Sequence, residues 1–145
     1  MRSLGLDIGD KRIGLALSDP LGILATPLDV FERIEDTAVI AQILGVVARD
    51  RVELIIAGMP QSMDGSLGMQ AEKVQVFVEK LRQASPVPVE YRDERLTTVE
   101  AKRMIEQGRA KKFSRSKKGE FDAAAAAVIL QSYLNEKRPL EYPPE

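Results

Sequence analysis

The residues best suited to chemistry in this chain are carboxylates at three separate places. Asp7 lies inside the apolar run "LGLDIG", Asp93 and Glu94 follow "VPVEYR", and Asp122 opens "DAAAAAVIL". A carboxylate within a strand is costly to bury unless it is paired or bound to a metal ion. Three carboxylates can hold two divalent cations, which activate a water molecule and stabilise the leaving oxygen in phosphodiester cleavage. We therefore interpret Asp7, Asp122 and one member of the Asp93–Glu94 pair as candidate metal ligands and catalytic residues.

The sequence contains no cysteine and no histidine. Disulfides, thiolate catalysis and cysteine-type zinc sites are therefore excluded, as are catalytic triads and metal sites that use histidine. Catalysis must rely on carboxylates, lysine, tyrosine or a metal ion held by oxygen ligands. Sites built only from oxygen favour hard divalent cations, and we expect Mg²⁺ or Mn²⁺ as the cofactor.

A basic segment between Gly108 and Gly119 indicates the sign of the substrate. It contains no acid and six cationic residues, which are Arg109, Lys111, Lys112, Arg115, Lys117 and Lys118. The formal net charge of the chain is only -1, so a nucleic-acid partner needs a local patch of this kind. Such a segment suits a phosphate backbone, and Phe113 within it is available for base stacking.

Each of these features also has a purely structural explanation. An aspartate in the first turn of a helix, such as Asp122, complements the helix dipole, and alanine is the best helix former. Acids on loops and runs of lysine are usually solvated at the surface. Asp7 is the hardest to explain in this way, because it interrupts a strand that must be buried.

Two short strands, predicted over residues 3–9 and 12–18, must position Asp7. Side chains alternate between the two faces of a strand, so Leu4, Leu6 and Ile8 share one face. The opposite face carries small or polar residues: Gly5, Asp7, Gly14 and Ala16. A face of this kind accommodates an element that approaches closely.

The element that fits this face is the last predicted helix, over residues 120–135. Five consecutive alanines, residues 123–127, leave no long side chain to hold the helix away from a sheet. We expect this helix to pack on the small-residue face and to bring Asp122 near Asp7. The two acids would then share one site.

The remaining pattern predicts a single α/β domain over residues 1–138 and a Pro-rich, frayed tail over 139–145. The further elements are a strand over 22–31, placed at a sheet edge by Pro27, a helix over 36–50 with Asp36 as a candidate cap, a strand over 52–60, a helix over 69–84, a strand over 86–92 and a helix over 97–107. Three hairpin strands followed by βαβ connections give a five-stranded mixed sheet with helices on both faces. No apolar run is long enough to span a bilayer, and the N-terminus does not read as a signal peptide, so we expect a cytoplasmic protein.

Four motifs, taken in order, resemble those of the YqgF/RuvX family. They are "GLDIGDKRIGLALSD", "IIAGMPQSMDG", "DERLTTVEA" and "FDAAAAAVILQSYL". The family is related to the RuvC Holliday-junction resolvases and has a ribonuclease H-like fold. The resemblance implies a metal-dependent endonuclease that matures the 5′ end of pre-16S rRNA during ribosome biogenesis. Holliday-junction resolution is the older proposal for the family.

Carried over by position, the resemblance implies the catalytic and metal-binding set Asp7, Glu94 and Asp122. It also places Lys11, Arg12 and Arg95 where they contact phosphate, surface charge being the alternative. RuvC-type enzymes have a further acid at the end of the fourth strand, whereas this chain has "AGMPQ" there and no acid until Asp64. This departure weakens a strict analogy with resolvases.

Two other classes of protein remain as alternatives. Sugar kinases and actin-like ATPases begin with a similar hairpin, but they need two such domains around a cleft. A non-catalytic RNA- or ribosome-binding module would keep the fold and lose the chemistry. The expected partner is structured RNA, namely precursor rRNA, with branched DNA and a ribosomal particle as alternatives. We expect a monomer, with a dimer as the alternative.

Overall fold

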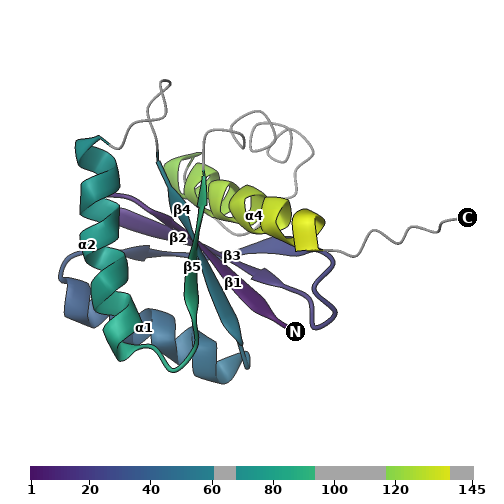
Figure 1. Cartoon of the computed structure of the whole chain (residues 1–145). Coiled ribbons are helices and arrows are strands. Elements are labelled where there is room, and N and C mark those ends of the chain that lie inside the picture. Colours follow the sequence, from purple (N-terminus) through teal and green to yellow (C-terminus); the bar gives the residue numbers. More distant parts are fainter. Residues whose placement is uncertain (61–67, 94–116, 138–145) are drawn as a thin grey trace, which may run out of the picture.

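The computed structural model of the chain describes residues 1–60, 68–93 and 117–137, with side chains of the last range described from Asp122 onward. Its centre is a five-stranded sheet with the order β3-β2-β1-β4-β5 (Figure 1). The strands are β1 (Ser3–Ile8), β2 (Arg12–Ser18), β3 (Ala25–Glu32), β4 (Leu54–Met59) and β5 (Val89–Asp93). The helices in the described ranges are α1 (Asp36–Arg49), α2 (Met69–Ala84) and α4 (Lys117–Lys137). The predicted helix over 97–107 lies outside them.

The sheet is mixed, as predicted. β1 pairs antiparallel with β2, and β2 pairs antiparallel with β3. β4 runs parallel to both β1 and β5. β3 is an edge strand, which suits Pro27 because proline has no N–H to donate to a second neighbour.

Helices cover both faces of the sheet, which confirms the predicted layers. Leu4, Leu6 and Ile8 of β1 pack in one apolar cluster with residues of α1 and α2. Ile56 of β4 packs in a second cluster with α4, and α4 covers the face opposite to α1 and α2 (Figure 1). The alternation of side chains along each strand therefore divides the core into two halves. No helix in the described ranges is long and apolar enough to cross a membrane.

Three strands begin later than the sequence pattern indicates: β4 by two residues, and β3 and β5 by three each. β5 begins at Val89 rather than at residue 86, because Pro86 and Pro88 cannot donate to the ladder. Pro88 contributes only its carbonyl oxygen, which accepts from the N–H of Ile55 at 3.0 Å. β3 begins at Ala25 rather than at residue 22, because the preceding residues form a turn in which Gly22 has a φ of 73°.

One helix start and one helix cap also differ from the prediction. α4 begins at Lys117 rather than at residue 120, so Lys117 and Lys118 belong to a helix and not to a loop. Lysine is a good helix former, and the helix begins before Gly119. Asp36 is the first residue of α1 and not its cap, a position that Glu35 occupies without a side-chain hydrogen bond.

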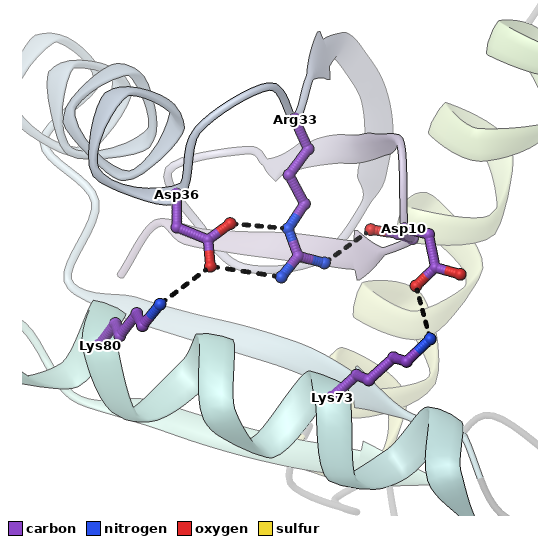
Figure 2. Close-up of polar contacts among 6 residues, drawn as sticks. Asp10, Arg33, Asp36, Lys73 and Lys80 are labelled. Atoms are coloured by element: carbon purple, nitrogen blue, oxygen red, sulfur yellow. Dashed lines mark hydrogen bonds and ion pairs between the residues drawn. The ribbon is translucent and has the colours of Figure 1, made fainter.

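The carboxylate of Asp36 instead joins a polar network between α1 and α2 (Figure 2). Arg33 Nε donates to Asp36 Oδ1 at 2.9 Å, and Lys80 Nζ of α2 lies 3.3 Å from Asp36 Oδ2. Nearby, Lys73 and Asp10 form a longer and exposed ion pair at 3.9 Å. Arg33 is the best buried of these side chains, at 14% exposure. The network connects the end of β3 to both helices on this face.

This network predicts a specific dependence of stability on pH. The hydrogen bond from Arg33, aided by that from Lys80, holds the pKa of Asp36 below its ordinary value of 3.8. A lowered folded-state pKa contributes stability that is complete above the unfolded-state pKa and is lost as the pH falls through the folded one. We expect Asp36→Asn to lower the free energy of unfolding by about 1 kcal/mol at neutral pH. Urea unfolding should show that difference shrinking as the pH falls below 3.8, and a difference that does not change with pH would contradict the role of the charge.

Candidate active site

Asp7 lies on the face of the sheet that α4 covers. In the antiparallel ladder Asp7 is directly opposite Gly14, and Gly5 is opposite Ala16. Directly opposed residues point to the same face, with Cβ atoms about 5 Å apart. Asp7 is half-buried, and its neighbour across the ladder has no side chain. The predicted small-residue face therefore exists, with Asp7 at the end nearest the β1–β2 turn.

α4 approaches this face so closely that glycine is required beneath it. A Cβ added to Gly14 would overlap the backbone carbonyl of Asp122 and come within 3.0 Å of the Ala123 nitrogen. A Cβ added to Gly5 would lie 2.7 Å from Cβ of Leu130. The alanines predicted to allow close packing are buried against the sheet, with Ala123, Ala124, Ala126 and Ala127 fully inaccessible. The predicted packing of the alanine-rich helix is confirmed.

Polar contacts fix α4 along its length. Gln131 accepts from the backbone N–H of Ala25 and donates to the carbonyl of Ile23, both at 2.9 Å. On the other side, Arg92 of β5 donates to Ser132 Oγ at 2.7 Å and pairs with Glu136. These contacts span the sheet from β3 to β5 and hold the helix over β1 and β2.

The backbone of Asp122 lies over Gly14, the residue directly opposite Asp7 in the ladder, and the carboxylate of Asp122 is paired with Arg12. Arg12 Nε donates to Asp122 Oδ2 at 2.7 Å, with side-chain exposures of 36% and 23%. Arg12 is two residues before Gly14 on β2, so its side chain projects from the same face. Because this pair is partly exposed, it contributes little to stability. The guanidinium of Arg12 instead provides a positive charge at the place where a metal ion would bind Asp122.

The donor set fits a hard divalent cation. Asp7 and Asp122 each supply carboxylate oxygens, the ligands that Mg²⁺ and Mn²⁺ prefer, and both lie beside Gly14. Among the described residues, no group of three acids, histidines or cysteines is close enough to hold a metal ion. The third predicted ligand, Glu94, lies just beyond them.

Asp93, the alternative to Glu94, ends β5 with its side chain on the face of the sheet that α1 and α2 cover, opposite to Asp7. It is paired with Met59 of β4, which packs in the cluster with α1 and α2. The preceding residue, Arg92, contacts α4, and successive side chains of a strand point to opposite faces. Asp7 and Asp93 therefore project from opposite sides of the sheet, which favours the next position along the chain, Glu94.

The cations predicted to contact phosphate are only partly described. Lys11 is exposed in the β1–β2 turn, and Arg12 is bound to Asp122. Lys117 and Lys118 begin α4, so the same helix carries both lysines and Asp122. Arg95, Arg109, Lys111, Lys112 and Arg115 lie outside the described residues.

The amino-acid sequence over residues 1–136 matches a protein-family model described as "RuvX: Holliday junction resolvase". The chain belongs to the RuvX family. A relative from Crocosphaera subtropica is 45% identical over 136 residues, covering 94% of each chain. A relative from Halothermothrix orenii is 44% identical over 140 residues, covering 97% of this chain and 99% of that one. Both bear the name "Putative pre-16S rRNA nuclease". The resemblance read from the four motifs is confirmed.

Solved structures share the fold of this RuvX chain at low sequence identity. A Fowlpox virus resolvase in complex with Holliday junction DNA aligns with a TM-score of 0.62 at 13% identity, covering 96% of this chain and 100% of that one. Thermus thermophilus RuvC, in complex with a Holliday junction substrate, aligns with a TM-score of 0.57 at 18% identity, covering 94% and 95%. These likenesses confirm the predicted ribonuclease H-like fold.

Proposed function

We propose that this chain is a metal-dependent endonuclease that hydrolyses phosphodiester bonds in the precursor of 16S rRNA. The family match and the names of its relatives confirm the prediction of a nuclease. The observation that carries the proposed site is that Asp7 and the backbone of Asp122 both adjoin Gly14, one across the ladder and one from α4 above it. Two acids from opposite ends of the sequence come together there on a surface shaped to allow it.

The residues around Gly14 have distinct roles in this proposal. Asp7 and Asp122 hold the cation, with Glu94 as the third ligand. A divalent cation bound there supplies an activated water and neutralises charge on the phosphate. Asp122 needs its carboxylate for this purpose, so Arg12 leaves it and becomes available to a phosphate oxygen. A guanidinium matches phosphate by two parallel hydrogen bonds, which suits Arg12 to that second position.

Cleavage should therefore depend strictly on a divalent cation. We expect wild-type protein to cut an RNA that spans the 5′ junction of 16S rRNA in the presence of Mg²⁺ or Mn²⁺. Chelation by EDTA should abolish the reaction, and added metal should restore it. Gel analysis of end-labelled RNA, with a four-way DNA junction in parallel, measures both activity and substrate preference. Cutting of the junction alone would favour a resolvase, and binding of RNA without cutting under any metal condition would favour a non-catalytic module.

The basic segment predicts the salt dependence of RNA binding. We expect neutralising Lys111, Lys112, Lys117 and Lys118 to weaken binding and to flatten its dependence on salt concentration. The physical reason is that each phosphate contact displaces about one counterion from the RNA, so that losing a contact lowers the number of counterions released on binding by about one. Arg49→Gln, at the exposed end of α1, is the control and should leave the slope unchanged. Filter binding over a range of salt concentrations measures it, and an unchanged slope in the lysine variant would exclude this segment as the binding surface.

A further inference from the structure

The β1–β2 turn determines where two residues of the proposed site lie. Asp7 precedes this turn by two residues, and Arg12 closes it. Within the turn, the N–H of Gly9 donates to the carbonyl of Arg12 at 2.9 Å. A change in the backbone between Gly9 and Arg12 would therefore move the ion pair with Asp122 and tilt the end of β1.

Arg33 contacts this turn twice, from the end of β3. Its backbone N–H donates to the carbonyl of Lys11 at 2.8 Å. Its guanidinium donates through Nη1 to the carbonyl of Gly9 at 2.9 Å (Figure 2). The two carbonyls belong to residues on either side of Asp10, so both arms of the turn are bound to one residue. The side-chain contact comes from the face of α1 and α2, opposite to the face that carries Asp7.

Arg33 is itself held in place by a carboxylate and by an aromatic ring. Its Nε and Nη2 donate to the two carboxylate oxygens of Asp36, at 2.9 and 3.4 Å. Its guanidinium lies over the ring of Phe77 in α2, at 4.7 Å from the ring centre. Phe77 is fully buried, so this stacking surface cannot shift without disturbing the core. A planar group that stacks and donates to several acceptors at fixed angles is specific to arginine.

We infer that Arg33 is a positioning residue for the active site, acting through the backbone of the β1–β2 turn. The inference rests on the proposed function, because it assigns Asp7 and Arg12 their roles there. Arg33 does not contact the substrate or the reacting atoms. It holds the β1–β2 turn against α1 and α2, and the turn in its place fixes the positions of Asp7 and Arg12 on the other face. Groups that hydrogen-bond directly to metal ligands typically affect activity by about 10–100-fold when replaced, and we expect an effect of that order for Arg33, which acts one step further away.

Arg82 provides a matched control at another place in the same layer. It lies over the ring of Tyr91 at 5.1 Å, donates to the carbonyl of Val89 at 2.9 Å and pairs with Glu79 at 2.8 Å. Each of the two arginines therefore contacts one aromatic ring, one backbone carbonyl and one carboxylate, but the partners differ. Arg82 binds the start of β5, whereas Arg33 binds the turn beside Asp7. Only Arg33 should matter for catalysis.

The experiment compares Arg33→Lys with Arg82→Lys at a temperature well below the thermal unfolding midpoint of either variant. Lysine keeps the charge, but it cannot stack on the ring and has one nitrogen in place of the three that donate from the guanidinium. We expect both variants to be somewhat less stable, and only Arg33→Lys to lower kcat for RNA cleavage by about 10–100-fold, with a smaller change in KM. Hydrogen exchange at the Gly9 amide is the readout independent of activity. It should accelerate in Arg33→Lys and stay as in wild type in Arg82→Lys.

The outcomes separate this inference from the proposed function. If wild-type protein cleaves RNA and Arg33→Lys cleaves at the same rate, or if both variants lose activity equally, the positioning role is wrong. If wild-type protein does not cleave, the proposed function fails, and Gly9 exchange alone decides whether Arg33 orders the turn. Should Arg33→Lys not fold, Asp36→Asn removes one anchor of the guanidinium and should lower kcat in the same direction. An unchanged kcat and unchanged Gly9 exchange in that variant would overturn the inference.

Discussion

Asp7→Asn is expected to lower the rate of RNA cleavage by at least about 100-fold, because replacing a residue that merely supports a metal ligand already costs about 10–100-fold. Asparagine has the shape of aspartate and can accept hydrogen bonds, but it lacks the charge that binds a divalent cation. The free energy of unfolding should therefore stay within about 1 kcal/mol of wild type. The large effect falls on chemistry and the small one on stability.

Asp10→Asn is the matched control for this prediction. Asp10 is three residues away, its side chain is 58% exposed, and among the described residues it forms a long ion pair with Lys73 at 3.9 Å. Its loss should leave cleavage unchanged. Single-turnover cleavage at saturating Mg²⁺, with unfolding in urea measured alongside, separates the two variants. Equal activity of Asp7→Asn and wild type would remove Asp7 from the site.

Gly14→Ala is expected to have the largest effect on stability. Its new Cβ would overlap the carbonyl of Asp122, a backbone atom that cannot move without shifting the first turns of α4. Overpacking of this kind costs about 1–3 kcal/mol or more. The shift also moves Asp122 relative to Asp7, so cleavage should fall together with stability, even at temperatures where the variant is fully folded.

Gly45→Ala tests whether steric conflict is the cause. Gly45 lies on an exposed part of α1, and a Cβ there would meet no atom within 4 Å. Alanine favours a helix over glycine by up to about 1 kcal/mol, so this variant should be slightly more stable than wild type. Urea unfolding of the two variants should give changes of opposite sign. A Gly14→Ala protein as stable as wild type would show that α4 does not lie as close to β2 as described.

The small-residue face and its covering helix could be predicted because the information is local. Alternation along two adjacent strands identifies the face that carries Asp7, and a run of alanines identifies a helix able to approach it. Complementary size then suffices to predict their contact. The order of strands follows in the same way, since short connections produce hairpins and helical connections produce parallel neighbours.

Contacts between distant side chains could not be predicted from such patterns. Arg12 was expected to contact phosphate, and its pairing with Asp122 joins positions 110 residues apart. Arg33 has no distinctive pattern around it, because an arginine before a helix is common. Its one local signal was an acid three residues later, Asp36, with which it pairs. The carbonyl of Gly9 that it binds has no signature in the sequence.

The start of α4 shows the other limit of pattern reasoning. Glycine and lysine between residues 108 and 119 indicated a loop, yet the helix includes Lys117. Propensity is a weak guide where packing of the following apolar turns can extend a helix. The sequence pattern also places the end of β5 one residue too early, at 92: the strand continues to Asp93, which determines the direction of the Asp93 side chain.

The most direct test of the metal site is a titration with Mn²⁺ followed by amide NMR, because a paramagnetic ion broadens the resonances nearest to it even when it binds weakly. The amides of Gly14, which is opposite Asp7, and of Ala123, which follows Asp122, should broaden first in wild-type protein and recover on addition of excess Mg²⁺. In Asp7→Asn this local broadening should disappear. Broadening centred elsewhere in the chain, or an identical pattern in Asp7→Asn, would contradict a metal site at this position.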